Sequence, residues 1–164
     1  MRLVHLLVSI AAACLFAASS APAQRIQIRS HPEVGAKCLD VPLGRYRPGA
    51  RLIMFSCLGV PNQIFEYDAF TQELKIGGLC VEAHRLGAGP NKPGDAVGLW
   101  ACHGGANQRW RPGLMDATYG NMVVNGGGNN LCMDIAFGSA SDGAMLVLWT
   151  CHGGANQWFL SQPR

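Results

Sequence analysis

The 164-residue sequence lacks any cluster of basic residues and carries little net charge. Thirteen Lys and Arg residues face ten Asp and Glu residues, and the basic residues are spread along the chain. Proteins that bind nucleic acid usually gather positive charge on one face or one segment. The sequence therefore gives no indication of a nucleic-acid partner.

The sequence also lacks the residue patterns of common catalytic sites. It has no Gly-x-Ser-x-Gly motif and, outside the N-terminal segment, no odd cysteine. A glycosidase needs two carboxylates about 5–10 Å apart across one bond. Here the acids at recurring positions occur once in each of three repeats, and the chain has no room for a separate catalytic domain. We therefore predict that the protein is not an enzyme.

Only the N-terminus contains a long apolar run, so no other segment is a candidate to span a bilayer. Arg2 precedes an apolar stretch that ends in Ala21-Pro22-Ala23, a small-x-small cleavage pattern. This is the pattern of a signal peptide over residues 1–23. A retained anchor is the alternative, and Ala11-Ala12-Ala13 before Cys14 matches a lipidation site poorly. We expect cleavage near Ala23 and Gln24 and a secreted or periplasmic protein without membrane insertion, leaving one domain over residues 24–164.

Three copies of one unit fill that domain, over about residues 25–67, 73–111 and 122–161. Each copy has a cysteine, an acid two residues later, a Gly/Pro-rich turn, an apolar strand with an aromatic, a second cysteine and Asn-Gln. The heptapeptide CHGGANQ occurs twice, at residues 102–108 and 151–157. Agreement in register over whole copies indicates true internal repetition.

Repetition also predicts the disulfides, since an exported protein meets oxidising conditions and every copy should form the same bond. Each bond closes a loop of about twenty residues and stabilises the fold by about 3 kcal/mol in the chain-entropy model. A zinc site is disfavoured, because the Cys-His pairs lack ligand spacing and the first copy has Leu58 in place of His. We predict no cofactor and no metal. The expected pairs are Cys38–Cys57, Cys80–Cys102 and Cys132–Cys151.

The repeats predict an all-β fold, because short alternating and β-branched runs lie between Gly/Pro turns and no stretch has a convincing helical period. A propeller would need four or more blades, so three copies imply closure about a threefold axis. The twelve expected strands are 25–29, 38–41, 51–57, 63–67, 73–76, 80–83, 96–102, 108–111, 122–125, 132–135, 144–151 and 157–160.

The sequence resembles the ricin B-type lectin domain, a β-trefoil whose signature is a thrice-repeated Gln-x-Trp. The signature stands here as Gln63-Ile64-Phe65, Gln108-Arg109-Trp110 and Gln157-Trp158-Phe159, so only the middle copy is literal. The resemblance covers essentially the whole mature chain. It implies that the glutamine and the aromatic are mainly scaffold, as are Leu99 and Leu148.

The same resemblance implies a carbohydrate site in each repeat. In the third repeat Asp134 would accept hydrogen bonds from sugar hydroxyls, Trp149 would stack on the apolar ring face, and Asn156 and His152 would bind further hydroxyls. Gln157 is expected mainly to orient the others. Individually, the acid also suits a turn cap, the Trp a core position and the His a structural role. Their combination in one repeat favours sugar binding.

The other two repeats offer weaker versions of this set. The second has Glu82 in place of Asp and a turn three residues longer, and the first has Phe55 in place of Trp and no His. We expect the third site to be the best, then the second, then the first. The second set is Glu82, Trp100, His103, Asn107 and Gln108, and the first is Asp40, Phe55, Asn62 and Gln63.

The predicted partners are glycans, galactose-type or related. One alternative is a protein-binding or inhibitory trefoil, which would have no reason to repeat the acid–aromatic–Asn set. Another is the glycan-binding subunit of a larger toxin, adhesin or hydrolase assembly, in which case a partner protein would exist.

Overall fold

A computed structural model describes residues 22–85, 89–114, 120–124 and 130–164. The predicted signal peptide, apart from its last two residues, lies outside them. The described residues form twelve β-strands and no α-helix. No helix among them is long and apolar enough to cross a membrane.

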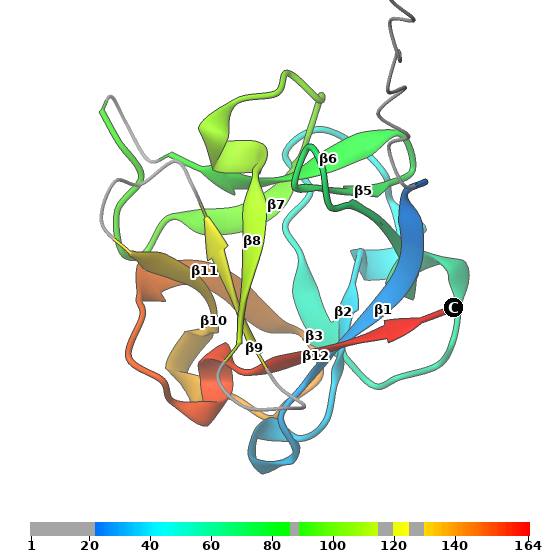
Figure 1. Cartoon of the computed structure of the whole chain (residues 1–164). Coiled ribbons are helices and arrows are strands. Elements are labelled where there is room, and N and C mark those ends of the chain that lie inside the picture. The colour runs from blue at the N-terminus through cyan, green and yellow to red at the C-terminus, as the bar shows by residue number, and fades with distance from the viewer. Residues whose placement is uncertain (1–21, 86–88, 115–119, 125–129) are drawn as a thin grey trace, which may run out of the picture.

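The strands divide equally among the three repeats, four to each (Figure 1). Every strand matches one predicted from the sequence, and Gly/Pro-rich turns separate them. The strands are β1 (Gln24–Ser30), β2 (Cys38–Asp40), β3 (Ile53–Phe55), β4 (Phe65–Asp68), β5 (Glu73–Ile76), β6 (Leu79–His84), β7 (Ala96–Trp100), β8 (Trp110–Leu114), β9 (Gly120–Val124), β10 (Leu131–Ile135), β11 (Ala144–Thr150) and β12 (Phe159–Pro163).

The predicted strand boundaries need correction. The expected strands 51–57 and 96–102 are shorter in the structure, as β3 (Ile53–Phe55) and β7 (Ala96–Trp100), and a second error recurs in all three repeats. Gln63, Gln108 and Gln157 do not begin strands but end short 3-10 helices, η3 (Pro61–Gln63), η4 (Ala106–Gln108) and η7 (Ala155–Gln157). The strands begin two residues later, at the buried aromatics. From the end of this turn, each glutamine side chain bonds to the acid near the start of its own repeat.

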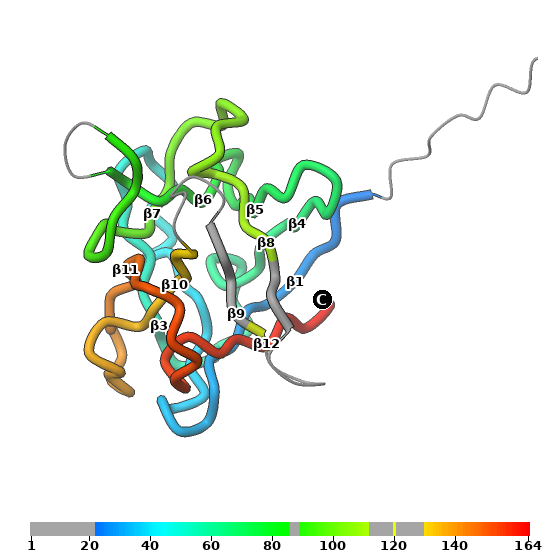
Figure 2. Tube along the Cα trace, turned by 60° about the vertical axis from the view of Figure 1, so that its left-hand side comes forward, coloured from blue at the N-terminus to red at the C-terminus, as the bar shows by residue number. Residues whose placement is uncertain are grey.

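Six strands form a ring and six form hairpins. Antiparallel pairing links β1 to β4, β4 to β5, β8 to β9, β9 to β12 and β12 to β1, and a bridge from Glu73 to Arg109 joins β5 to the start of β8. Both views show β12 alongside β1, so the two ends of the domain lie together (Figures 1 and 2). The ring leaves few unpaired edges.

The hairpins β2–β3, β6–β7 and β10–β11 meet through their second strands. β11 pairs with both β3 and β7, and Arg51, just before β3, bridges to Gly98 in β7. The contacts repeat around the axis: the backbone N–H groups of Gly49, Gly94 and Gly143 donate to the carbonyls of Leu99, Leu148 and Met54. In every case the accepting residue immediately precedes the aromatic of the next repeat's candidate site.

All three repeats contribute to one hydrophobic core. Leu99, Leu148 and the aromatics Phe65, Trp110 and Phe159 are buried, as predicted for scaffold residues. The Trp110 indole Nε1 donates to the Val81 carbonyl at 2.9 Å, which satisfies its polar atom inside the core. The largest fully buried side chains are Trp110, Phe65, Ile28, Leu39, Leu52, Met54, Leu74, Leu99, Leu131, Met133, Ile135 and Leu146.

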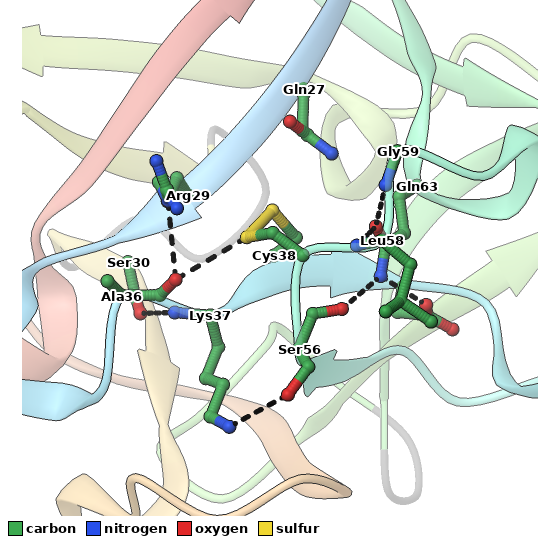
Figure 3. Close-up of a disulfide and its surroundings, with 12 residues drawn as sticks. Gln27, Arg29, Ser30, Ala36, Lys37, Cys38, Ser56, Leu58, Gly59 and Gln63 are labelled. Atoms are coloured by element: carbon green, nitrogen blue, oxygen red, sulfur yellow. Dashed lines mark hydrogen bonds between the residues drawn. A yellow bond between two sulfur atoms is a disulfide. The ribbon is translucent and has the colours of Figure 1, made fainter.

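One disulfide lies within each repeat, and all three predicted pairs are confirmed: Cys38–Cys57, Cys80–Cys102 and Cys132–Cys151. Figure 3 shows the first, next to the Gln63 side chain. The amide of Gln63 donates to the Ser56 carbonyl and accepts from the N–H groups of Leu58 and Gly59. Disulfide and glutamine thus hold the same loop.

Candidate carbohydrate site

The carboxylate of Asp134 is the centre of the third-repeat site. It lies at position four of β10, is 4% exposed, and accepts from Asn156 Nδ2 at 2.9 and 3.0 Å and from Gln157 Nε2 at 2.8 Å. A carboxylate offers about four lone-pair positions, so these bonds leave part of its accepting capacity for a ligand. Burial raises the pKa of Asp134 above its usual 3.8, and the bonds from Gln157 and Asn156 partly oppose that rise.

Next to this acid, His152 is held in one orientation. Its Nδ1 accepts from the Gly154 N–H at 3.1 Å, and its Nε2 lies 3.4 Å from Asp134 Oδ2. Because Nδ1 accepts, the proton of the neutral ring belongs on Nε2, the nitrogen that faces the carboxylate. The His edge and the Asn156 amide therefore flank Asp134.

The repeated heptapeptide has a packing explanation. A Cβ added to Gly154 would lie 2.7 Å from His152 Cε1 and 2.8 Å from Asn156 Oδ1, so only glycine fits between these two side chains. Gly153 before it has φ +71°, a left-handed conformation that favours glycine. In the first repeat Leu58 replaces the His, and Val60 stands where the second glycine would be. The glycine is thus present only where a His must be accommodated.

Trp149 forms one side of a pocket of about 510 Å³ above Asp134. It is the sixth residue of β11, and 48% of its surface is exposed, so its ring is not a core side chain. A half-exposed indole beside a carboxylate and an amide provides both an apolar face and directed hydrogen-bonding groups. The pocket is lined by Arg51, Gly94, Asp134, Ala136, Phe137, Gly138, Met145, Val147, Trp149, His152 and Asn156.

The second repeat gathers the predicted residues with altered contacts. Glu82 Oε2 accepts from Gln108 Nε2 at 2.7 Å and lies 2.9 Å from His103 Nε2. Asn107 does not bond to the acid; its amide donates to the Ala83 carbonyl at 3.4 Å. Trp100 is 43% exposed. Together with His84, Arg85 and Gly89, Glu82, Trp100, His103 and Asn107 line a pocket of about 550 Å³.

The first repeat keeps the acid but has a more apolar surround. Asp40 accepts from Asn62 at 3.0 Å and from Gln63 at 2.9 Å, and burial raises its pKa too. Phe55 lines a smaller pocket of about 400 Å³ with Asp40 and Asn62. The remaining lining residues are Pro42, Leu43, Gly44, Ile53, Leu58 and Val60, none of which is charged.

The three glutamines are fully buried beneath these pockets and line none of the three. Gln157 uses its amide on Asp134 and the Thr150 carbonyl, and its oxygen accepts from the His152 N–H at 2.9 Å. Gln63 and Gln108 repeat this arrangement. The geometry assigns them the task of positioning the acid.

Sequence reasoning missed several pocket residues. Phe137 and Leu43, each three residues after the acid, adopt left-handed backbone (φ +59° and +56°) and are 102% and 81% exposed. They stand in η6 (Ala136–Gly138) and η2 (Pro42–Gly44) at the edges of the third and first pockets. Their common spacing from the acid was the available signal. Arg51 had no such signal, because it enters the third pocket from another repeat.

Among the described residues, no group of three or more His, Cys, Asp and Glu side chains is arranged to hold a metal ion. The side chains of the three candidate sugar pockets can form hydrogen bonds and stacking contacts with a ligand.

Comparison with known proteins agrees with this arrangement. No curated protein sequence matches the chain. Among solved structures, a designed threefold-symmetric protein, ThreeFoil, superposes with a TM-score of 0.72 at 25% identity, covering 84% of this chain and 96% of that one. The Macrolepiota procera ricin B-like lectin in complex with lactose gives 0.70 at 14% identity, covering 88% and 98%.

The earthworm R-type lectin C-half in complex with GalNAc gives a TM-score of 0.61 at 17% identity, covering 86% of this chain and 99% of that one. These likenesses show that the fold is a β-trefoil. The family model of the ricin-type beta-trefoil lectin domain matches residues 24–159. The chain therefore belongs to the ricin-type β-trefoil lectin family.

Proposed function

We propose that this protein is a secreted carbohydrate-binding module that holds galactose-type or related glycans in up to three shallow sites and catalyses no reaction. The observation that carries the proposal is the third-repeat pocket. There a buried, oriented carboxylate, an amide and an imidazole edge lie beside a half-exposed Trp149.

This set suits a pyranose. One face of the ring carries C–H groups that pack on an indole, and the hydroxyls at its edge donate to a carboxylate and exchange bonds with an amide. The relatives bound to lactose and GalNAc support a galactose-type ligand as the first to test. We assign the third site the highest affinity, the second an intermediate one and the first the lowest.

Binding without catalysis is supported by the carboxylate count in each pocket. Asp134, Glu82 and Asp40 are each the only acid lining their pocket in the described part of the chain. Hydrolysis of a glycosidic bond requires an acid and a second carboxylate acting together. We expect no turnover of glycosides, esters or peptides by the purified mature chain.

Export is part of the proposal. Three disulfides form and persist in an oxidising compartment. The proposed leader, residues 1–23, would direct the chain there and leave a single domain over residues 24–164. Mass spectrometry of the protein recovered from culture medium or periplasm would test cleavage near Ala23.

The decisive experiment is titration of the mature protein with methyl galactoside, lactose and xylo-oligosaccharides, with calorimetry and NMR as the two measurements of binding. A shallow site with one stacking face should bind a monosaccharide with a Kd near 1 mM, about 4 kcal/mol. Multivalent glycans should bind more tightly by avidity. Absence of binding to every neutral and charged glycan on an array would refute the proposal.

A further inference from the structure

The third-repeat pocket takes part of its wall from the first repeat. Arg51 precedes β3, and its backbone bridges to Gly98 in the second repeat. Its side chain lines the pocket that contains Asp134 and Trp149, with Nη1 3.8 Å from the sulfur of Met145. The three repeats thus meet where this guanidinium lies.

Arg51 has no acidic partner among the described residues. None of the ion pairs formed there includes it, and a thioether sulfur is a weak acceptor. The one carboxylate of the pocket, Asp134, is buried and already accepts from Asn156 and Gln157. Among the described residues that line this pocket, Arg51 is therefore the one Lys or Arg, and no acid holds its guanidinium.

The second pocket shows the same pairing of a bonded acid with an exposed arginine. There Arg85 lines the wall, and its Nη1 donates to the Gly89 carbonyl at 3.1 Å. The first pocket contains Asp40 but no cationic side chain. Arginine thus occurs in the two pockets that also have the Trp and His, although it comes from a different sequence position in each.

We propose that the third-repeat pocket selects glycans with an anionic group, a carboxylate or a sulfate ester, and that Arg51 binds that group. A guanidinium presents parallel N–H donors that match the two oxygens of a carboxylate or sulfate. The neutral part of the sugar would occupy the Asp134–Trp149 region. This inference rests on the proposed function, because it names the ligand class of the same site.

The test compares sugars that differ only at carbon 6: methyl galactoside, methyl galacturonide and methyl galactoside 6-sulfate. Site-resolved NMR titration of the Trp149 indole signal reports the third pocket alone. We expect one or both anionic sugars to bind about two- to fivefold more tightly than the neutral one, the range for an exposed ion pair. The two anionic arms distinguish carboxylate from sulfate, and the preference should shrink at high salt.

Arg51→Gln should remove the anionic preference, so that the two anionic sugars bind this variant no more tightly than methyl galactoside does. Arg47→Gln is the matched control. Arg47 lies four residues before Arg51, its side chain is exposed and it does not line this pocket, so the substitution removes the same charge outside the site. Equal binding of neutral and anionic sugars, or a preference that survives in Arg51→Gln, would overturn the inference and leave the lectin function standing. If none of the three sugars binds at this pocket and no other glycan binds the protein, both the inference about Arg51 and the proposed lectin function are refuted.

Discussion

The second and third pockets differ by one methylene group in the acid, and the consequences extend through the hydrogen-bond network. Asp134 receives its bonds from Asn156 and Gln157, with His152 at the longer distance of 3.4 Å. Glu82 reaches farther, lies 2.9 Å from His103, and loses the bond to Asn107. The acid is therefore tied to the amide in one pocket and to the imidazole in the other.

This difference shows what the shorter acid achieves. The shorter acid keeps the imidazole at the longer distance of 3.4 Å and binds the Asn156 amide, so both groups flank the carboxylate in defined positions. A longer acid occupies the imidazole and leaves the amide to a weak backbone contact at 3.4 Å. The third pocket is consequently better prepared for a ligand, and the following predictions test that comparison.

Removing the acid should have the largest effect. Asp134→Ala should abolish binding at the third site, because the sugar hydroxyls lose their acceptor, and should lower the free energy of unfolding by about 1–3 kcal/mol, because buried donors of Gln157 and Asn156 lose their partner. Titration and urea denaturation measure the two effects. Glu82→Ala is the matched change and should remove only the weaker second site. Unaltered binding in Asp134→Ala would move the site elsewhere.

Acidification should weaken sugar binding at the third site, and the loss should begin at a higher pH than an ordinary aspartate would give. Burial raises the pKa of Asp134, and the protonated acid accepts fewer bonds, so affinity should fall about tenfold per pH unit below that pKa. The free energy of unfolding has the opposite pH dependence. Because the pKa of Asp134 is raised in the folded protein, its stabilising contribution is present below pH 3.8 and is lost as pH rises through the raised pKa. Titrations from pH 3.5 to 7 should show the loss, and Asp134→Asn should lack the pH step.

Loss of the stacking face should come next. Trp149→Ala should weaken binding about tenfold, which takes a millimolar site beyond detection, while the melting temperature stays near that of the parent because the ring is half-exposed. Trp110→Ala is the contrasting control, since deletion of that buried ring should cost about 3–5 kcal/mol of stability. A large drop in stability for Trp149→Ala would assign it to the scaffold instead.

A smaller disturbance should follow from a single methyl group in the heptapeptide. Gly154→Ala and Gly105→Ala should each displace the His and Asn that pack on that glycine, because the new Cβ would lie within 2.9 Å of both. Overpacking of this kind lowers the free energy of unfolding by about 1–3 kcal/mol. The displaced His and Asn should also weaken sugar binding at the same site. Val60→Ala in the first repeat should be nearly silent, since Leu58 there requires no such gap. Chemical shifts of the His rings would report the displacement.

The smallest effect, and the most direct comparison of the two pockets, is expected from Glu82→Asp. Shortening the acid should allow a bond from Asn107 and lengthen the contact with His103, raising affinity at the second site about two- to fivefold. The Trp100 indole signal in a titration isolates this site. If the affinity falls instead, the longer turn of the second repeat, and not the acid, limits that pocket.

The repeats made most of the fold predictable. Cysteines at matching positions gave the disulfides, and alternating apolar residues gave all twelve strands. The strand starts at Gln63, Gln108 and Gln157 were wrong, because a short 3-10 turn leaves no periodic pattern in three residues. Side chains placed by hydrogen bonds across a turn are not encoded in strand periodicity.

Within the site, the residues that belong to one repeat were predictable and those contributed by another were not. Asp134, Trp149, His152 and Asn156 share a spacing that recurs along the chain, and the structure brings them together. Arg51 and Gly94 reach the same pocket through pairing between repeats, which a single sequence does not reveal. Phe137 depends on a left-handed backbone that its residue type disfavours.

The three turn glycines that bond to the strand of the following repeat have a consequence for protein engineering. Because Gly49, Gly94 and Gly143 each hold the segment before a neighbour's aromatic, no excised repeat contains a finished site. A peptide spanning the third repeat alone would lack the partner that fixes Trp149. Three copies of that repeat assembled as a homotrimer, or fused in tandem, would supply the missing partner to one another and yield three identical pockets.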